Sequence, residues 1–377
     1  MGSGDLLPLV PPSEQIRPVD NMAKDPRVEL AVAHWGGRFV SNGVPLADFQ
    51  EVTAGLDRWE DWCAGFSERA ALHEKMGRDA LAQKLFISAG EHLTRAAVLY
   101  HFAKYLFVID LDQMKAAHMK AVDCHKLALP YLDPPAERVK IPYEGSTIYG
   151  NLRIPKGVDT PPILIMCMGL DSTKEEMGAN EANYLRRGMA TLAFDGPGQG
   201  EGEYDWPIRP DYEAVVTAVC DFVETRDDVD AERMGVWGVS MGGYYAPRAA
   251  AFEKRLKACI SLSGPFDFGE RWDAFPPMSK DTFRVRAQCE TLEDAADVAA
   301  KLSLVDVAKN ITCPLFVVTG ELDRLFPYTD AERLAREASG PTELLIVERG
   351  GHVANNRRYV YDAATSDWMA VQLGVRS

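Results

Sequence analysis

One stretch constrains the fold of this chain more than any other, the sequence Gly238-Val-Ser-Met-Gly242. It follows a short apolar run at residues 234–237 and precedes a segment typical of a helix at residues 244–251. The spacing predicts a tight strand-to-helix turn that presents Ser240 as a nucleophile, with glycines where the backbone comes too close for a side chain. The Met241 N–H, at the start of the helix, is then an expected oxyanion donor. The alternative is a purely structural glycine-rich turn.

Length, charge and cysteine content limit the classes of protein to consider. The 377 residues suit one α/β domain of about 250 residues and a second unit. A net charge of −15 argues against a nucleic acid or an anionic membrane as partner, since both favour basic patches. The seven cysteines form no C-x-x-C pair, which predicts buried free thiols in a reducing, cytoplasmic setting. We expect no signal peptide and no membrane span.

The first third of the chain has a helical texture. Residues 1–26 carry prolines and charges with little periodicity, and we expect an extended or disordered leader there. Apolar residues then recur at helical spacing, which predicts a helical N-terminal cap domain of about five helices over residues 27–135. Pro134 and Pro135 end it.

The pattern changes at residue 136, where the predicted catalytic domain, residues 136–377, begins. Alternating residues at 138–154 predict an antiparallel hairpin. Buried-strand patterns then alternate with helical stretches, which predicts an α/β fold with a mostly parallel, doubly wound sheet. The expected strands are residues 163–168, 190–195, 234–237, 256–262, 315–319 and 344–348. The long interval before residue 315 predicts an insertion at about 265–309, over the edge of the sheet where such folds bind ligands.

A serine nucleophile needs a base and an acid that orients the base. Asp323 follows the strand expected at 315–319 and is our candidate acid, with Glu321 and Asp267 as competitors. His352 follows the last strand in a glycine-rich loop and is the single histidine after residue 135. The order serine, acid, histidine is that of the α/β-hydrolase fold. A surface-loop histidine is the alternative for His352.

The loop after the strand at 163–168 should supply the second oxyanion donor. We expect the Leu170 N–H to be this donor, with the Gly169 N–H as the second choice. Gly169 is also expected to contact the substrate. Asp171 then lies near the nucleophile, where it binds a polar substrate group or acts as a further acid or base. The equally weighted alternative is that Asp171 and Ser172 cap a helix that begins at Lys174.

Further candidates for substrate contact are Tyr244, after the elbow, and Tyr100, His101 and Tyr105 of the helical segment. Core packing is the competing explanation for these aromatic residues.

Two other patterns look like ligand sites but are better explained otherwise. Residues 195–201, Asp-Gly-Pro-Gly-Gln-Gly-Glu, lack the Lys-Ser/Thr of a phosphate loop, and we interpret them as the tight turn that leaves a strand. His118 and His125 could share a helix face, but without a third ligand we interpret them as polar surface. The sequence thus implies no metal and no cofactor.

Together these motifs resemble one family, the α/β-hydrolases around 2,6-dihydroxypseudooxynicotine hydrolase. That group includes fungal polyketide-shortening hydrolases and, more distantly, fermentation-respiration switch-type esterases. The likeness extends over about residues 27–373. It is carried by Gly238-Val-Ser-Met-Gly-Gly243, Gly169-Leu-Asp-Ser-Thr-Lys-Glu-Glu176, residues 187–201 and the helical stretches Gly90-Glu-His-Leu-Thr-Arg-Ala96 and Tyr100-His-Phe-Ala-Lys-Tyr105.

The resemblance implies a hydrolase with an N-terminal helical cap, a homodimer in many members, and a Ser240–His352–Asp323 triad acting on a small-molecule substrate. Members nearest the nicotine enzyme cleave a C–C bond next to a ketone and carry Glu where this chain has Asp171. The nicotine enzyme itself also has Arg where this chain has Val239. We therefore expect an acyl-enzyme reaction on a β-diketone or acyl-aromatic compound. The alternatives are a carboxylesterase or thioesterase, an acyl transferase or cyclase with the same triad, and a hydrolase-fold binding protein without catalysis.

Overall fold

The computed structural model describes residues 24–375. Of the leader expected at residues 1–26, residues 1–23 lie outside the described residues. The first helix begins at Pro26. Asp25 caps this helix, because its carboxylate accepts the Arg27 N–H at 2.8 Å.

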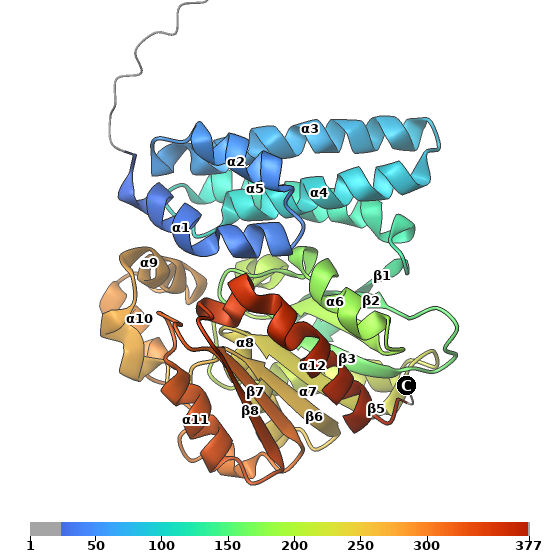
Figure 1. The fold of residues 1–377 in the computed structure, drawn as a ribbon, viewed down its shortest axis with the longest axis vertical. Coiled ribbons are helices and arrows are strands. Elements are labelled where there is room, and N and C mark those ends of the chain that lie inside the picture. Colours follow the sequence, from blue (N-terminus) through green and yellow to red (C-terminus); the bar gives the residue numbers. More distant parts are fainter. Residues whose placement is uncertain (1–23, 376–377) are drawn as a thin grey trace, which may run out of the picture.

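Five helices form a layer across the top of the molecule in Figure 1, and we call them the helical layer. They are α1 (Pro26–Ser41), α2 (Leu46–Ala54), α3 (Trp62–Ala82), α4 (Phe86–Lys104) and α5 (Leu111–Ala128). Their apolar faces enclose a core of their own, rich in aromatic rings such as Phe39, Trp62 and Phe102. Phe39 stacks on Phe102 with ring centroids 3.8 Å apart. The predicted helical N-terminal region is confirmed.

Below the helical layer lies one eight-stranded sheet in the order β1-β2-β4-β3-β5-β6-β7-β8 (Figure 1). β1 pairs antiparallel with β2, and β2 with β4, whereas the remaining neighbours are parallel. The predicted hairpin and mostly parallel sheet are therefore confirmed. The strands are β1 (Ala136–Tyr143), β2 (Ser146–Arg153), β3 (Pro162–Cys167), β4 (Ala190–Asp195), β5 (Asp230–Val239), β6 (Leu256–Leu262), β7 (Leu315–Gly320) and β8 (Thr342–Val347).

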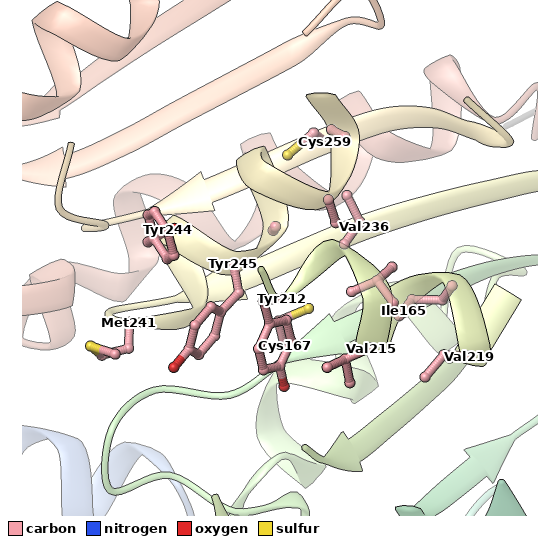
Figure 2. Close-up of a cluster of buried hydrophobic side chains, with 14 of the residues drawn as sticks. Ile165, Cys167, Tyr212, Val215, Val219, Val236, Met241, Tyr244, Tyr245 and Cys259 are labelled. Carbon is pink, nitrogen blue, oxygen red and sulfur yellow. The ribbon is translucent and has the colours of Figure 1, made fainter. Parts of the chain in front are cut away.

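Helices cover both faces of the sheet. The helices that connect successive parallel strands are α6 (Gly178–Leu185), α7 (Glu213–Glu224), α8 (Gly242–Phe252) and α11 (Tyr328–Glu337), and α12 (Arg358–Gln372) follows β8. Apolar residues of α7, α8 and α11 pack on one face, and those of α6 and α12 on the other. Figure 2 shows part of the first core, where the Tyr212 and Tyr245 rings stack with centroids 3.7 Å apart. Burial on both faces explains the continuous apolar runs of the central strands.

The long interval between β6 and β7 holds two helices, α9 (Pro277–Arg286) and α10 (Leu292–Ala299). In Figure 1, α9 lies just below α1, and α10 lies below α9. Short 3-10 turns complete the chain: η1 (Trp59–Asp61), η2 (Leu129–Tyr131), η3 (Lys174–Glu176), η4 (Gly200–Tyr204), η5 (Gly269–Ala274), η6 (Ala308–Asn310) and η7 (His352–Arg357). The division into domains at residues 27–135 and 136–377, with an insertion at 265–309, stays a prediction.

The cysteines lie in the described part of the chain as free thiols. Five of them are buried, as expected, whereas Cys289 and Cys313 are only half-buried. Within residues 24–375, every helix is too short or too polar to cross a lipid bilayer.

Candidate active site

The elbow has the geometry that its glycines predict. Ser240 lies between β5 and α8 with a φ of 56°, a left-handed conformation that costs energy for a residue with a side chain. A Cβ at Gly238 would overlap the carbonyl oxygen of Gly242, and a Cβ at Gly242 would overlap that of Cys167. The Ser240 N–H donates to the Leu262 carbonyl oxygen at 2.9 Å, which ties the elbow to β6. The turn therefore holds the serine side chain above the carboxyl ends of the strands.

The structure brings the three predicted triad residues together. His352 Nε2 lies 2.9 Å from Ser240 Oγ, and His352 Nδ1 lies 2.8 Å from Asp323 Oδ2. The other oxygen of Asp323 accepts the N–H groups of Leu325 and Phe326 at 2.9 and 3.1 Å. With Nδ1–H donating to Asp323, Nε2 is free to accept the serine proton. The arrangement can therefore generate a serine nucleophile.

The imidazole is held by its surroundings as well as by the acid. The Trp35 ring of α1 meets the His352 ring edge to face at 5.6 Å, and the Phe326 ring does so at 5.5 Å. The next residue, Val353, donates its N–H to the buried Ser263 hydroxyl at 3.1 Å. A side chain of the helical layer thus packs directly against the candidate base.

The two competing acids have other partners. Glu321 accepts the Arg349 N–H at 2.8 Å, and Asp267 accepts the Ser303 hydroxyl at 2.7 Å. Of the three acids considered, Asp323 is the one that contacts His352.

The loop after β3 runs against the elbow, as an oxyanion loop must. A Cβ built on Gly169 would lie 3.2 Å from the Ser240 Cβ. Leu170 and Met241 line one pocket together with Ser240. Within the described residues, neither the Leu170 nor the Met241 N–H donates to another protein group. Both are therefore free to receive an oxyanion, and their role stays a prediction.

The buried Gln199 fixes this loop. Its Nε2 donates to the carbonyl oxygens of Met168 and Gly169 at 2.5 and 2.9 Å, and its Oε1 accepts the Tyr212 hydroxyl at 2.7 Å. Gln199 belongs to the glycine-rich turn after β4, where Gly198 and Gly200 have positive φ. That segment is the tight turn that the sequence predicts, and it supports the oxyanion loop.

The capping alternative for Asp171 is wrong. The turn η3 begins after Thr173 without a side-chain cap. Asp171 instead pairs with Arg38 of α1, at 2.8 Å between Nη1 and Oδ2, and the Ser172 hydroxyl accepts from Arg38 Nη2 at 3.1 Å. Asp171 lines the pockets on both sides of Ser240. Its carboxylate is therefore available to the site, oriented by an arginine of the helical layer.

Arg38 also joins the layer to the fully buried Glu176, with Nη2 and Oε1 2.6 Å apart. Burial opposes the charge of Arg38, but the Asp171 and Glu176 carboxylates outweigh it and raise the pKa of the guanidinium. Burial likewise opposes ionisation of Glu176, but Arg38 and His101 hold the pKa of this carboxyl below its usual range. The rings of Trp35 and Phe102 lie 5.8 and 5.6 Å from the guanidinium carbon.

Three pockets that share lining residues lie around Ser240 and His352. A polar pocket lies toward Arg38 and Asp171. An apolar pocket lies toward the insertion, and it is lined by rings such as Phe268, Trp272 and Phe275. A larger cavity of about 350 Å³ lies between α1, α9 and the loop that bears His352. Trp35 lines all three pockets. The site can thus enclose an aromatic or aliphatic acyl compound with one polar group.

Three predicted substrate contacts lie away from these pockets. Tyr244 is buried under the elbow, where its hydroxyl donates to the Pro210 carbonyl oxygen at 2.8 Å. The Tyr100 hydroxyl donates to Glu74 at 2.9 Å inside the helical layer. His101 is buried behind Glu176 and lies 3.1 Å from the Thr173 hydroxyl. Core packing explains these three residues.

Tyr105, in contrast, lines the larger cavity and packs on Trp35.

The surface interpretation of His118 and His125 is wrong, because both are buried where α5 meets the sheet. His118 Nδ1 lies 2.8 Å from the Tyr204 hydroxyl. His118, Glu175 and Asp195 offer atoms within 4.8 Å of one another, a spacing that a metal ion would need. However, the Lys174 ammonium lies 2.7 Å from Glu175 and 2.6 Å from Asp195. This donor set therefore neutralises a lysine and does not fit a cation.

Sequence reasoning missed Trp35 as a site residue, and it missed Arg38 altogether. The available signal was weak: Arg38 follows Trp35 by three residues and so occupies the apolar face of its helix, where a charge needs a partner.

Comparison with known proteins agrees with this geometry. The family model for FrsA-like esterases matches residues 48–304. The chain is 33% identical to 2,6-dihydropseudooxynicotine hydrolase of Paenarthrobacter nicotinovorans over 95% of this chain and 94% of that protein. The crystal structure of 2,6-dihydroxy-pseudo-oxynicotine hydrolase superposes with a TM-score of 0.83 at 32% identity, covering 90% of this chain and 95% of that one. Hydrolyase poxO of Penicillium oxalicum is 32% identical over 65% of this chain and 60% of its own length.

The match to the nicotine-related hydrolase includes the helical layer as well as the sheet, since it extends over nearly the whole of both chains. The chain therefore belongs to the FrsA-like esterase family of α/β-hydrolases, and it is a hydrolase.

Proposed function

We propose that this enzyme is a serine hydrolase that cleaves an acyl compound through an acyl-enzyme on Ser240. The observation that carries the proposal is the continuous hydrogen-bonded line from Ser240 through His352 to Asp323, at the junction of three pockets. His352 takes the serine proton as Oγ attacks the carbonyl carbon. The Met241 and Leu170 N–H groups receive the oxyanion.

His352 then returns the proton to the leaving group. When the bond broken joins the carbonyl carbon to another carbon, that carbon must be stabilised, as it is beside a ketone or on an electron-rich aromatic ring. Water, activated by His352, releases the acid and restores Ser240. A C–C bond next to a ketone, in a β-diketone or acyl-aromatic compound, is the reaction that we favour, because the chain resembles the nicotine-related hydrolase along nearly its whole length.

The pocket chemistry supports the same choice. The rings of the insertion suit an aromatic or apolar body, and Asp171 offers a carboxylate to a substrate hydroxyl or other hydrogen-bond donor. Ester or thioester hydrolysis, and acyl transfer or cyclisation, use the same triad and are the alternative reactions. A non-catalytic binding protein is the remaining alternative. We further propose a cytoplasmic homodimer, in line with the free thiols and with the resemblance to the family.

A substrate panel tests the proposal. Wild type and Ser240→Ala are incubated with benzoylacetone-type 1,3-diketones, acyl phenols and 4-nitrophenyl esters, and the acids released are quantified. We expect turnover of diketones or acyl phenols by wild type and none by the variant. Turnover confined to esters would establish an esterase in place of the C–C hydrolase. No turnover of any compound by wild type would favour the binding protein.

A further inference from the structure

The cavity of about 350 Å³ beside His352 is positively charged, although the protein as a whole carries a net charge of −15. Arg324 and Arg349 line it with His34, and no aspartate or glutamate of the described chain lines it. The two arginines come from different loops, after β7 and after β8, and they face α1 and α9 across the cavity. We propose that this cavity binds an anionic group, a carboxylate or a phosphate, at the far end of the acyl substrate. This inference rests on the proposed function of Ser240.

The charge of these arginines is not cancelled by neighbours within residues 24–375. Arg324 makes one side-chain hydrogen bond there, from Nη1 to His34 Nε2 at 2.9 Å. Burial, followed by the nearby Arg324 charge, lowers the pKa of His34, so this histidine is a neutral acceptor. Glu321 accepts the backbone N–H of Arg349 at 2.8 Å, and within residues 24–375 the Arg349 guanidinium has no carboxylate partner of its own. Arginines are usually paired in this protein, as Arg38 and Arg286 are.

The position of the cavity links it to the reaction. It shares Trp35, Leu106 and Leu325 with the apolar pocket that contains Ser240. His352 lines the cavity directly. Leu30 and Met278 line the same cavity as the two arginines, so it offers apolar neighbours to the body of a substrate and guanidinium groups to its charged end. Guanidinium groups bind carboxylates and phosphates through paired N–H donors.

Matched esters test the proposal. Mono-4-nitrophenyl adipate, 4-nitrophenyl hexanoate and 4-nitrophenyl 6-aminohexanoate have the same chain length and differ in the charge at its end. We expect wild type to prefer the adipate ester over the hexanoate ester by about tenfold in kcat/KM, with the amino ester poorest. The preference should shrink as ionic strength rises, because salt screens exposed charges.

Three variants test whether the two arginines cause this preference: Arg324→Gln, Arg349→Gln and the double variant. We expect the adipate preference to fall to near one in the double variant, with hydrolysis of the hexanoate ester unchanged. Arg186→Gln, the same charge change at the end of α6, is the control and should keep the preference. Equal rates with adipate and hexanoate esters in wild type, or an unchanged preference in the double variant, would overturn the proposal.

A binding measurement tests the cavity without turnover. Calorimetric titration of wild type and the double variant with glutarate, and separately with inorganic phosphate, should show binding that the double variant loses. The tighter of the two ligands identifies the anionic group. If a serine-directed probe labels Ser240 but no anion binds, the proposed function stands and the anion site is wrong. If an anion binds but Ser240 is unreactive, the anion site stands and the proposed function is wrong.

Discussion

The α/β part of the molecule and the helical layer contribute to the site in different ways. In the proposed reaction the sheet supplies the groups that make and break bonds, since Ser240, Asp323 and His352 all follow strands. The helical layer supplies Trp35 against the imidazole and Arg38 on Asp171, from a single helix. On this proposal, residues that follow the strands carry out the reaction, and residues of α1 affect substrate binding and the rigidity of the site. Variants in the two regions should fail in different ways.

The largest effect should come from the acid. Asp323→Asn keeps the size of the side chain but lets the amide stabilise the wrong tautomer of His352, and we expect kcat to fall by about 10⁴-fold. Ser240→Ala should be at least as severe, and the double variant no worse than the serine variant alone, because the residues act as a unit. Steady-state kinetics check this. If kcat of Asp323→Asn were lower than that of wild type by a hundredfold or less, another residue would have to be the acid that orients His352.

Arg38 should matter first for stability. Arg38→Met leaves Asp171 and the buried Glu176 without their cation, which we expect to lower the free energy of unfolding by about 3–5 kcal/mol. Arg38→Lys should recover part of this, since an ammonium cannot pair with both carboxylates as the guanidinium does.

Adding Asp171→Asn and Glu176→Gln to Arg38→Met should restore most of the loss, as urea titration of the four proteins would show. Equal stability of wild type and Arg38→Met would mean that the helical layer is not held to the oxyanion loop by this ion pair.

The seam between α5 and the sheet should be sensitive to acid. His125 Nδ1 lies 3.2 Å from the Asn151 amide, and burial lowers its pKa to about 4. The unfolded chain takes up this proton near pH 6.5 and the folded chain near pH 4, so stability is retained above pH 6.5 and lost as the pH falls between those values. The lowered pKa of one such histidine reduces the free energy of unfolding by on the order of 3 kcal/mol when the pH falls from above 6.5 to about 4.

His125→Gln removes that titration. Its stability should therefore fall less than that of wild type between pH 7 and pH 4.5, in denaturant titrations at each pH. Parallel curves for the two proteins would contradict the assignment.

The smallest effect should come from Trp35. Trp35→Ala opens the wall shared by the three pockets, and we expect KM to rise about tenfold with a smaller change in kcat, since the triad hydrogen bonds do not involve the indole. Trp35→Phe should retain most of the affinity. A loss confined to kcat would instead show that the indole positions His352 for chemistry.

The same contrast governs what the sequence could predict. The elbow, Asp323 and His352 are recognisable because each lies in a short loop directly after a strand, where local glycines and chain order carry the information. Gly238 is required by a backbone contact with the nearby Gly242, whereas Gly242 is required by a contact with Cys167 at the end of β3, the neighbouring strand in the sheet. The eight-strand architecture follows from the same local patterns. The start of β5 was not predicted, because Asp230-Ala-Glu-Arg233 carries three charged residues and only Asp230 among them is paired with β3, next to a register shift.

The contacts that the helical layer makes with the site depend on how the layer packs against the sheet, and local sequence patterns do not predict that packing. His118 and His125 look polar in the sequence yet are buried, since their neighbours at the seam come from β2 and η4. Asp171 has the sequence of a helix cap, but an arginine 133 positions earlier takes its carboxylate. Tyr100 lies within α4 and bonds Glu74 inside the helical layer, whereas Tyr105 follows the last residue of α4 and lines the larger cavity.

The central claim is that Ser240 is an activated nucleophile, and intact-mass spectrometry after treatment with a fluorophosphonate probe tests it most directly. Wild type, Ser240→Ala and Asp323→Asn would be compared at equal concentration. The predicted result is one adduct on wild type, none on Ser240→Ala and much slower labelling of Asp323→Asn. An unlabelled wild type, or an adduct that persists in Ser240→Ala, would contradict the claim.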